Sequence, residues 1–434
     1  MNGEDHCIET LYAKVQIKKS YFQHRGFPLT EIWEHDLDRK ESYIAERLGH
    51  YQVIKNVGPI NIRESFFGGR TNNIKFHHSC SPNERIRYLD FTSLYPYVLK
   101  KYSYPMNHPS LIQENFSTVD DYFGFIKCKV VAPPKLHIGV LPVRIGNKLL
   151  FPLCKVCAAN LNPMSCHHTD EERSFTSTWT SIELQEAVRV GYHIIKIYQV
   201  LNYEKNNSTS IFADYIQMWL KVKQEASGWP SWVKTEEDKI KYVNDYQAAE
   251  NIELDPLLIE KNPGKRSIAK LMLNSFWGKL AQGYNLPQTK FLRSYADLWA
   301  LFNDETKEVM GVHEVSDTTI LTQSRFKDEF VQLSHPGKTN IAVASFITAY
   351  ARLELFRLIE RIESVREGRV LYFDTDSVVF IEQDGDPEIK CGDYLGELTD
   401  EIPEGHICDT FVSLGPKNYG YDIVNVETRK RRVL

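Results

Sequence analysis

The sequence VLYFDTDSVVFI, residues 370–381, places two aspartates between two runs of apolar residues. Short apolar runs on both sides of a polar interruption are typical of paired strands, so we predict a β-hairpin with Asp374 and Asp376 at its tip. A packed hairpin fixes both carboxylates and leaves their oxygens open to a ligand. An Asx turn without any ligand is the alternative interpretation of the same residues.

A third carboxylate, Asp90, follows the strand predicted at Ile86–Phe91 in RYLDFTSLYP, and a helix is predicted to begin near Leu94–Pro96. Rigid carboxylates are the ligands that hold two Mg²⁺ ions about 3.5–4 Å apart in phosphoryl-transfer sites. If Asp90 joins the two hairpin aspartates, the three residues form such a site.

The segment Lys261–Arg293 contains seven basic residues, no acidic residue and several interleaved aromatic residues. Clustered cations neutralise phosphates and flat rings stack on bases, so this segment favours a phosphate-bearing ligand. A helix is predicted from the Asn262-Pro263 cap to near Gly283. One face would present Arg266, Lys270, Asn274 and Trp277. The opposite face, suited to packing, would hold Ile268, Leu271, Met272, Ser275 and Leu280. A solvated basic face is the alternative.

The composition excludes several classes of protein. The chain has 434 residues, 42% of them hydrophobic, and a net charge of -5, which indicates several packed domains and excludes wholesale disorder. No apolar run approaches the roughly 18 residues of a membrane span. The polar start, MNGEDHCIET, is unlike a secretory signal, so we expect an intracellular chain without membrane contact, in the nucleus or the cytoplasm.

Strands and helices are predicted to alternate without regular order, which indicates the α+β class. Residues 8–50 predict two helices around a strand at Phe27–Trp33, and residues 122–151 are rich in strand signals. The remaining predicted elements are helices at Ser181–Val190, Ile211–Ala226 and Ile341–Ile362, and a strand at His193–Val200.

A compact group of sulfur and imidazole ligands predicts a structural zinc knuckle. It reads Cys154-x2-Cys157-x8-Cys166-His167-His168, with His168 preferred as the fourth ligand and His167 as the alternate. Ordinary reduced thiols in a loop are the other interpretation. The isolated cysteines are expected to be buried or incidental: Cys7, Cys80, Cys128, Cys391 and Cys408. The basic Arg429–Arg432 is expected to be an exposed tail, with a nuclear signal and a DNA contact as the alternatives.

Three of these motifs resemble the family B DNA polymerases. DFTSLYP (Asp90–Pro96) is similar to the D-x-x-S-L-Y-P motif, KLMLNSFWG (Lys270–Gly278) to K-x-x-x-N-S-x-Y-G, and YFDTDS (Tyr372–Ser377) to Y-x-D-T-D-S. Trp277 replaces a tyrosine, which puts any role of a hydroxyl there in doubt. PKNY (Pro416–Tyr419) looks like the primer-contacting K-x-Y motif. FFGGR (Phe66–Arg70) looks like the Y-x-G-G element of the protein-primed branch, and the insertions look like those of Polinton/Maverick and viral polymerases.

The resemblance implies a right-hand polymerase with an antiparallel palm sheet, helical fingers and an inserted subdomain. The implied regions are an N-terminal remnant or linker (1–60), a first palm segment (61–132), an insertion with the zinc knuckle (133–205), fingers (206–290), a second insertion (291–340) and a second palm segment (341–434). GFPLTEIWEHDLDR (Gly26–Arg39) loosely resembles an inactive restriction-like endonuclease remnant.

The resemblance also implies a role for each matching residue. Asp90, Asp374 and Asp376 would be the catalytic carboxylates that bind Mg²⁺. Tyr95 would exclude a 2′-hydroxyl. Those implied to bind the dNTP are Tyr95, Lys223, Arg266, Lys270, Asn274 and Trp277. Those implied to contact primer or template DNA are Gly68, Gly69, Arg70, Ser275, Gly278, Lys417 and Tyr419.

About 60 residues precede FFGGR and about 15 follow the K-x-Y motif. We therefore expect neither 3′–5′ exonuclease activity nor a complete thumb in this monomeric chain. The expected activity is DNA-directed DNA synthesis for a virus-like or transposon DNA, started from a primer or from a terminal priming protein. A catalytically inactive, truncated remnant that only binds nucleic acid is one alternative. An RNA-synthesising nucleotidyltransferase is another, and Tyr95 argues against it.

Overall fold

The computed structural model describes residues 8–24, 57–204, 211–283, 285–327, 330 and 339–434. Its contacts divide the chain into residues 1–59 and residues 60–434. The first unit contains helix α1 (Ile8–His24), which falls in the first helix predicted there. The predicted strand Phe27–Trp33, the segment Gly26–Arg39 and Cys7 lie outside the described residues.

A nine-stranded antiparallel sheet forms the centre of the second unit, as far as the described residues go. Its main path has the order β1-β13-β14-β3-β16-β17-β18, while β15 pairs with β3 and β2 pairs with β16. The strands are β1 (Thr71–Asn73), β2 (His77–Ser79), β3 (Glu84–Phe91), β13 (Val370–Asp374), β14 (Ser377–Gln383), β15 (Leu398–Asp400), β16 (His406–Gly415), β17 (Asn418–Asn425) and β18 (Arg431–Val433).

The predicted hairpin is confirmed as β13 and β14, and the register pairs Asp374 with Ser377. Side chains of both strands are buried on both faces of the sheet, which explains the two uninterrupted apolar runs. Strand β14 pairs with β3 so that Ser377 faces Asp90 across the ladder. Segments almost 300 residues apart in the sequence are thereby fixed next to each other.

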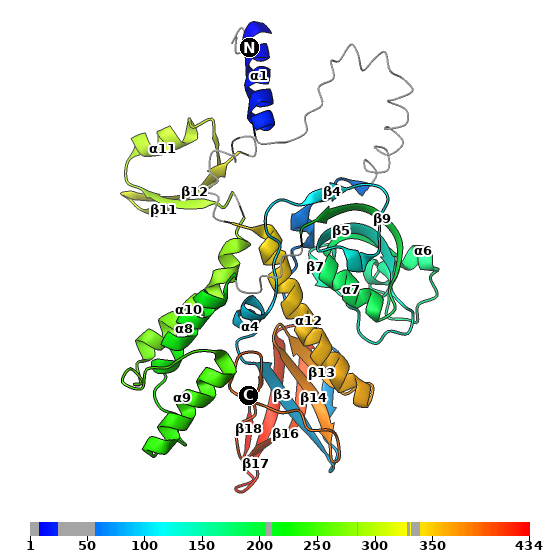
Figure 1. Ribbon diagram of the computed structural model, residues 1–434, viewed down its shortest axis with the longest axis vertical. Coiled ribbons are helices and arrows are strands. Elements are labelled where there is room, and N and C mark those ends of the chain that lie inside the picture. Colours follow the sequence, from blue (N-terminus) through cyan, green and yellow to red (C-terminus); the bar gives the residue numbers. More distant parts are fainter. Residues whose placement is uncertain (1–7, 25–56, 205–210, 284, 328–329, 331–338) are drawn as a thin grey trace. The chain divides into compact units, whose positions relative to one another are not determined.

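Two helices cover one face of these strands. Helix α12 (Ile341–Val365) contacts β13 and β14, and α4 (Leu94–Lys101) packs against α12 (Figure 1). Most of α12 is buried, because the helix is covered by the sheet on one side and by other helices and a second sheet on the others. The long helix predicted at Ile341–Ile362 is confirmed.

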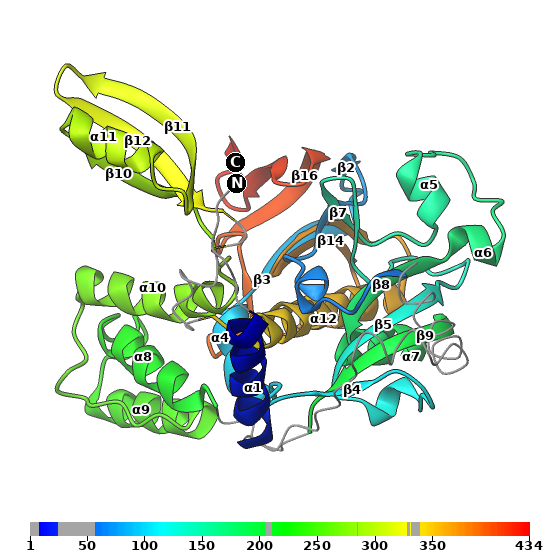
Figure 2. The same cartoon turned by 90° about the horizontal axis from the view of Figure 1, so that it is seen from above.

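Residues 211–283 contain three helices: α8 (Ala213–Glu225), α9 (Glu236–Glu250) and α10 (Pro263–Leu280). Helices α8 and α10 pack against each other, as both views show (Figures 1 and 2). Helix α10 begins at the predicted cap, where the Asn262 side chain accepts a hydrogen bond from Lys265 N.

The predicted packing face of α10 is wrong in part. Ile268 and Leu271 are 58% and 62% exposed, whereas Ala269 and Leu273 are buried. The ring of Phe276, on the same stripe, lies 4.5 Å from the ring of Tyr215 on α8. The small side chain of Ala269 allows the two helices to approach closely, and this turns the larger Ile268 and Leu271 toward solvent.

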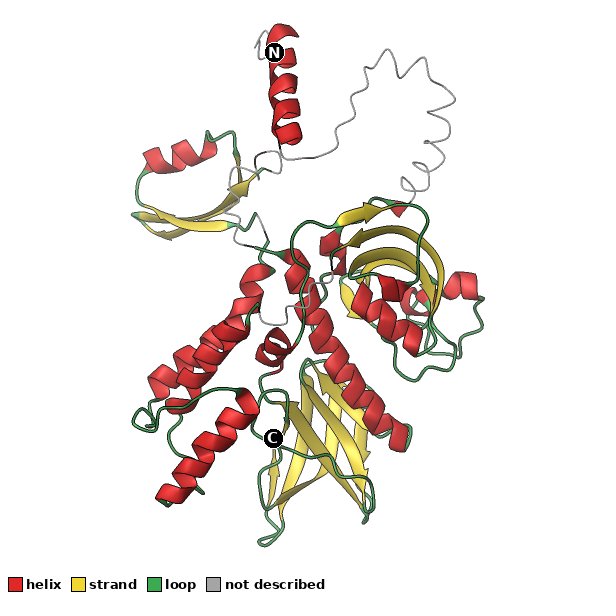
Figure 3. Cartoon of the chain, in the orientation of Figure 1, coloured by secondary structure: helices red, strands yellow, loops and turns green. Residues whose placement is uncertain are grey.

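A separate four-stranded sheet lies between α4 and α8 in the sequence (Figure 3). Its strand order is β4 (Ser110–Ile112), β9 (His193–Asn202), β5 (Gly124–Val131) and β8 (Phe175–Thr180). Helix α7 (Ser181–Arg189) packs against this sheet. The other elements of the segment are the short helix η2 (Val119–Asp121), the hairpin β6 (Val143–Ile145) and β7 (Lys148–Leu150), and the helices α5 (Lys155–Ala159) and α6 (Asp170–Arg173).

A three-stranded sheet follows α10, with the order β10 (Gln288–Leu292), β12 (Thr319–Phe326) and β11 (Lys307–Ser316) and with helix α11 (Tyr295–Phe302). The short helix η1 (Ile62–Ser65) precedes β1. The arrangement confirms the mixed α+β class. Within the described ranges, none of the helices has the length and apolar character of a membrane span.

The basic Arg429–Arg432 segment is exposed as predicted, but its last two residues belong to a strand and not to a tail. Its residues are exposed, but β18 pairs with β17 as an edge strand, and Arg431 forms an ion pair with Asp409 at 2.7 Å. All three residues of β18 are exposed, which fits a short strand at the edge of the sheet.

Candidate active site

Asp90 and Asp376 come together at one end of the central sheet. Phe91 N donates a hydrogen bond to the backbone oxygen of Asp376 at 2.8 Å, next to the Asp90–Ser377 pair of the ladder. Both aspartates line a cavity of about 440 Å³ between the sheet and α10. The tip of the hairpin therefore borders a partly open cavity that is lined by two carboxylates.

The surroundings of these two carboxyls disfavour their charged forms, first through burial and then through neighbouring carboxylates, and so raise their pKa values. Burial, followed by the charges of Asp376 and Glu401, raises the pKa of Asp90 to about 7, and Lys270 opposes this shift. Burial and then Asp374 raise the pKa of Asp376. Converging carboxylates repel each other unless a cation lies between them, and carboxylate oxygens are the donors that Mg²⁺ prefers. The donor set fits divalent cations of this kind.

Asp374 lies beside this pair but does not line the cavity. Its carboxylate accepts hydrogen bonds from the hydroxyls of Thr71 at 2.7 Å and Thr375 at 2.9 Å, and it pairs with Lys417 Nζ at 2.9 Å. Burial acts to raise the pKa of Asp374, but the ammonium of Lys417 and the hydroxyl donors outweigh it and lower the pKa. Asp374 thus keeps its negative charge, and Lys417 and the two hydroxyls balance that charge.

The predicted polar face of α10 forms the wall opposite the carboxylates. Arg266, Lys270, Asn274 and Trp277 all line the cavity, and Lys223 of α8 joins them. Burial and the neighbouring Arg266 and Lys270 lower the pKa of Lys223. Three cations thus face two carboxylates across one volume, which is a suitable charge distribution for an anionic ligand that carries metal ions.

Tyr95 lines the cavity next to α10. Its ring stacks on Trp277 at 4.6 Å between centroids with an interplanar angle of 8°. Burial raises the pKa of its hydroxyl to about 12. Ser93, two residues earlier, has a φ of +56°, which turns the chain from β3 into α4 and directs Tyr95 into the cavity. Such a backbone conformation is costly for a serine and clusters at functional sites.

Four of the residues predicted to contact DNA lie outside the cavity. Ser275 and Gly278 are exposed on α10, and open space surrounds the position of a Cβ at Gly278. The hydroxyls of Tyr419 and Tyr88 lie 2.7 Å apart, and Lys417 is 70% exposed in its side chain. None of these four predicted residues lines the cavity that contains the carboxylates.

The DNA contact predicted for Arg70 does not match the structure. Its side chain is only 1% exposed and donates to the backbone oxygens of Gly139 at 2.7 Å and Val140 at 3.0 Å. A guanidinium enclosed in this way cannot reach a phosphate. The space at Gly68 is open, whereas a Cβ at Gly69 would lie 2.7 Å from the Thr375 hydroxyl.

The predicted knuckle ligands form a compact cluster. The Sγ atoms of Cys154, Cys157 and Cys166 and one imidazole nitrogen of His168 all lie within 4.8 Å of one another. His168 Nδ1 is 3.5, 3.3 and 3.5 Å from the three sulfurs in that order. Hydrogen bonds from His168 lower the pKa of Cys166 to about 7. The geometry selects His168 over His167, and a Cys₃His cluster of this size could bind zinc.

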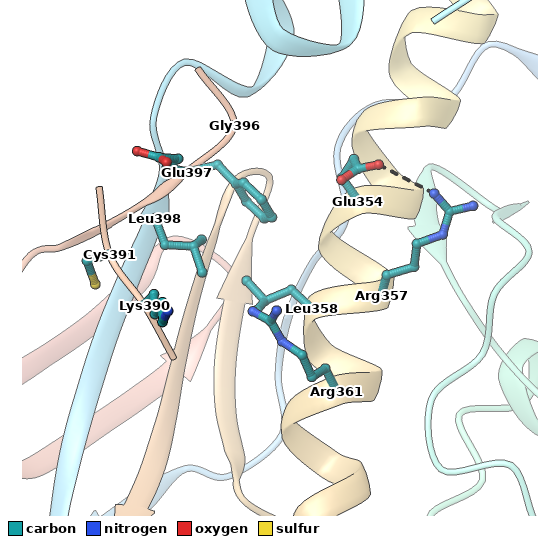
Figure 4. A pocket seen from close by; sticks show the side chains of 10 residues that line it. Glu354, Arg357, Leu358, Arg361, Lys390, Cys391, Gly396, Glu397 and Leu398 are labelled. Atoms are coloured by element: carbon teal, nitrogen blue, oxygen red, sulfur yellow. Dashed lines mark hydrogen bonds and ion pairs between the residues drawn. The ribbon is translucent and has the colours of Figure 1, made fainter. Parts of the chain in front are cut away.

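The isolated cysteines are elsewhere. Cys128 and Cys408 are buried, Cys80 is half-buried and Cys391 is exposed. Cys391 borders a second cavity, of about 410 Å³, between α12 and residues 390–398 (Figure 4). There Arg357 pairs with Glu354 at 3.4 Å. This cavity contains none of the residues predicted for the site.

Three residues near the carboxylates were not predicted from the sequence. Thr71 bonds Asp374, Glu401 contributes negative charge at Asp90 and Asp376, and the buried Arg352 donates to the backbone oxygens of Phe67 and Gly68. The position of Thr71 directly after FFGGR was a usable signal. Arg352, inside an apolar helical pattern, gave none.

Known proteins that are similar to this chain include two fungal polymerases. A "Probable DNA polymerase" of Neurospora intermedia is 23% identical over 351 residues, which cover 77% of this chain and 28% of that protein. A "Probable DNA polymerase" of Podospora anserina is 22% identical over 355 residues, 80% of this chain and 25% of that protein. The chain thus spans about a quarter of the length of these relatives.

Among solved structures, Phi29 DNA polymerase complexed with primer-template DNA and incoming nucleotide substrates has a similar fold. The TM-score is 0.52 at 17% identity, and the match covers 85% of this chain and 51% of that chain. The family model for organellar and viral DNA polymerases of type B matches residues 32–365, which is most of the sequence. The chain therefore belongs to the organellar and viral branch of the type B DNA polymerases.

Proposed function

We propose that the chain is a DNA-templated DNA polymerase that adds dNMP from dNTP to a primer 3′-hydroxyl or to a hydroxyl of a priming protein. One observation carries the proposal: Asp90 and Asp376 share a cavity with Arg266, Lys270 and Lys223. Carboxylates that suit Mg²⁺ and cations that suit phosphates occur here in one volume. Replication of a virus-like or transposon DNA would be its context.

In this proposal the regions of the chain correspond to a right hand. Residues 61–132 and 341–434 form the palm, residues 206–290 the fingers, and residues 133–205 and 291–340 the two insertions. The central sheet with α12 and α4 supports the first assignment, and the packed pair of α8 and α10 supports the second.

Asp90 and Asp376 would hold the two Mg²⁺ ions, which lower the pKa of the attacking hydroxyl and neutralise charge on the departing pyrophosphate. Asp374 would orient the turn through its bonds to Thr71 and Lys417 rather than through a direct contact.

The wall of α10 would bind the incoming nucleotide. Arg266, Lys270 and Lys223 would neutralise the triphosphate. Asn274 and Trp277 would line the base pair that forms. Tyr95, stacked on Trp277, would lie under the sugar and exclude a 2′-hydroxyl. This arrangement would orient the α-phosphate toward the metal ions held by the two carboxylates.

Template and primer would bind at the outer surfaces of the same cavity. Ser275 and Gly278 on α10 are exposed, and Gly278 leaves room for a nucleic acid strand. Lys417 and Tyr419 would steady the primer terminus. Gly68 and Gly69 remain candidates for a close backbone approach by the template, whereas the buried Arg70 is excluded from direct contact.

The Cys₃His cluster would bind one structural Zn²⁺ through Cys154, Cys157, Cys166 and His168. Three thiolates and an imidazole complete a tetrahedral set and leave no open position for a substrate. Metal analysis of the purified chain tests this assignment. About one equivalent of zinc supports it, and less than about half an equivalent contradicts it.

Primer extension on a gapped template, with Mg²⁺ and dNTPs, tests the proposed activity. The purified chain should extend the primer, and an Asp376→Ala variant should not. If the intact chain incorporates no more than this variant, the polymerase proposal fails, and binding of the same DNA without synthesis would then support the inactive nucleic-acid-binding alternative.

A further inference from the structure

A five-residue segment, Phe67–Thr71, contacts the carboxylate turn directly, and we call it the brace. The backbone oxygen of Arg70 accepts a hydrogen bond from Thr375 N at 2.7 Å. The hydroxyl of Thr71 donates to Asp374 at 2.7 Å, and Thr71 pairs with Asp374 in the ladder of β1 and β13. Gly69 lies so near Thr375 that a Cβ would clash. The brace thus contacts the turn at three consecutive positions.

The turn needs such support because its backbone is strained. Thr375 has a φ of +57°, in the left-handed region that a β-branched residue rarely adopts. A strained conformation persists only where surrounding contacts determine it. Since Thr375 stands between Asp374 and Asp376, any relaxation of its backbone moves the two carboxylates relative to each other.

The side chain of Arg70 attaches the brace to the first insertion, residues 133–205. Its Nη1 and Nη2 donate to the backbone oxygens of Gly139 and Val140, and its guanidinium lies 3.8 Å from the centre of the Phe151 ring. Burial lowers the pKa of Arg70 to about 9. Within the described residues, the hydrogen bonds of its side chain go to carbonyl oxygens and none goes to a carboxylate.

Arg352 attaches the brace to helix α12. It is 1% exposed, and its Nη1 donates to the backbone oxygens of Phe67 at 2.7 Å and Gly68 at 2.9 Å. Its Nε and Nη2 donate to Glu183 on α7, which is also buried. One arginine thereby joins the brace, the long helix and the insertion.

We propose that Arg70 and Arg352 are positioning residues that set the geometry of the Asp374–Asp376 turn through the brace, and that the first insertion contributes to the support for metal binding. The inference deepens the proposed polymerase function and rests on it for the rate effect. Buried arginines contribute little net stability compared with apolar residues, so their fixed, forked geometry is the property that fits this location.

Substitution of Arg70 by lysine separates positioning from folding. Lysine keeps the charge and can still donate hydrogen bonds, but it lacks the planar, forked guanidinium that bridges the two carbonyls and stacks flat on Phe151. Arg369→Lys is the control, because Arg369 is also buried and donates to two backbone oxygens, those of Ile381 and Ile362. Unlike Arg70, it also forms an ion pair, with Asp386 at 2.8 Å. It contacts the same hairpin at the end away from the carboxylates.

Four quantities should be measured on both variants: the Mn²⁺ dissociation constant, by electron paramagnetic resonance without nucleotide, the single-turnover rate of primer extension, the KM for dNTP and the Tm. Arg70→Lys should weaken Mn²⁺ binding and slow turnover, each by about tenfold, because small displacements of reacting groups cost this much. The KM for dNTP should stay within about twofold. Arg369→Lys should leave the Mn²⁺ dissociation constant and the single-turnover rate unchanged, even if it lowers the Tm as much as Arg70→Lys does.

Equal Mn²⁺ affinity in the unaltered chain and in Arg70→Lys would overturn the inference, as would an equal loss in Arg369→Lys. If Arg70→Lys does not fold, Phe151→Leu replaces it, with Phe151→Tyr as the variant that restores the stacked ring. If the unaltered chain binds Mn²⁺ but extends no primer, the polymerase proposal fails, while the Mn²⁺ comparison still decides the role of the brace.

Discussion

Asp90 shows how position in the fold sets the chemistry of a single carboxyl. Its backbone belongs to a buried strand, its side chain opens into the cavity, and Asp376 and Glu401 lie close enough to oppose its ionisation. The resulting pKa of about 7 holds for the protein without a metal ion. A bound divalent cation would favour the charged form.

The first prediction concerns the pH dependence of stability. Because the folded chain raises the pKa of Asp90 from 3.8 to about 7, it binds this proton more tightly than the unfolded chain. In metal-free buffer, this contribution to stability is complete below the ordinary pKa and is lost as the pH rises through about 7. Mg²⁺, which requires the charged form, should therefore raise the Tm more at about pH 8 than at about pH 6.

Thermal denaturation with EDTA and with Mg²⁺ at the two pH values measures this effect. An Asp90→Asn variant should lose most of the Mg²⁺ effect at both pH values. A rise in Tm on adding Mg²⁺ that is the same at both values in the unaltered chain would contradict the assignment of Asp90 to the metal site.

The second prediction concerns sugar selection by Tyr95. Its ring is stacked on Trp277 and lies within the cavity, so removing it should make room for a 2′-hydroxyl. Tyr95→Ala should reduce the preference for dNTP over NTP by about one to two orders of magnitude, measured as the ratio of kcat/KM values. Tyr95→Phe keeps the ring and should keep the preference. An unchanged ratio in Tyr95→Ala would contradict this role.

At this scale the sequence predicted residue types better than it predicted their surroundings. Asp90, Asp376 and Lys270 could be chosen because their motifs carry the chemistry. Arg70 was assigned to DNA only through the resemblance of FFGGR to the Y-x-G-G element, and a sequence motif does not say that the guanidinium is enclosed. The choice between His167 and His168 also depends on which ring faces the sulfurs, which spacing alone does not determine.

Helix α10 is the element that gives the cavity its positive charge. Its polar residues recur at helical spacing on one side, and Ala269 and Leu273 on another side pack into the core. The helix has no acidic residue to neutralise these cations internally. A charged ligand is therefore the partner that such a face favours.

The third prediction tests that face. Lys270→Met keeps the length of the side chain and removes the charge, which should cost about 1.5–3 kcal/mol of nucleotide binding and raise the KM for dNTP about tenfold or more. Lys265→Met on the same helix is the control, because Lys265 is exposed and does not line the cavity. Steady-state incorporation kinetics measure both. Equal KM values for the two variants would contradict the prediction.

The fourth prediction concerns the Cys₃His cluster. Cys157→Ser should release the metal and lower the Tm by several degrees, since a structural zinc site contributes to folding directly. Cys391→Ser, at an exposed and isolated thiol, is the control. Differential scanning calorimetry together with metal analysis gives both results. If Cys157→Ser had the same Tm as the control, this result would contradict a structural role for zinc at the cluster.

Elements could be predicted where their ends are marked in the sequence. The Asn262-Pro263 cap located α10, and the apolar runs around Asp374 located the hairpin. Helix α9 was missed although Thr235 and Asp238 form a capping box, because its sequence is polar throughout and lacks a clear apolar stripe. The packing face of α10 was misjudged because close helix contact at Ala269 depends on the neighbouring α8.

At the scale of the molecule, the site exists because segments distant in the sequence pair in one sheet. The register of β3 against β14 sets Asp90 next to the hairpin, and the brace reaches the same turn from residues 67–71. Periodicity predicts strands but not which strands pair, so the convergence followed from the family resemblance and not from spacing. In the first insertion the helix at Ser181–Val190 and the strand at His193–Val200 were predicted and correspond to α7 and β9, whereas the order of the strands in its sheet was not predicted.

The most direct test of the account is a crystal of the chain grown with primer–template DNA, Mn²⁺ and a non-hydrolysable dNTP, with the anomalous signal of manganese used to locate the ions. The account predicts manganese peaks between Asp90 and Asp376, with the triphosphate against Lys270 and Arg266. Nucleotide and manganese bound elsewhere, with these carboxylates free of metal, would contradict it.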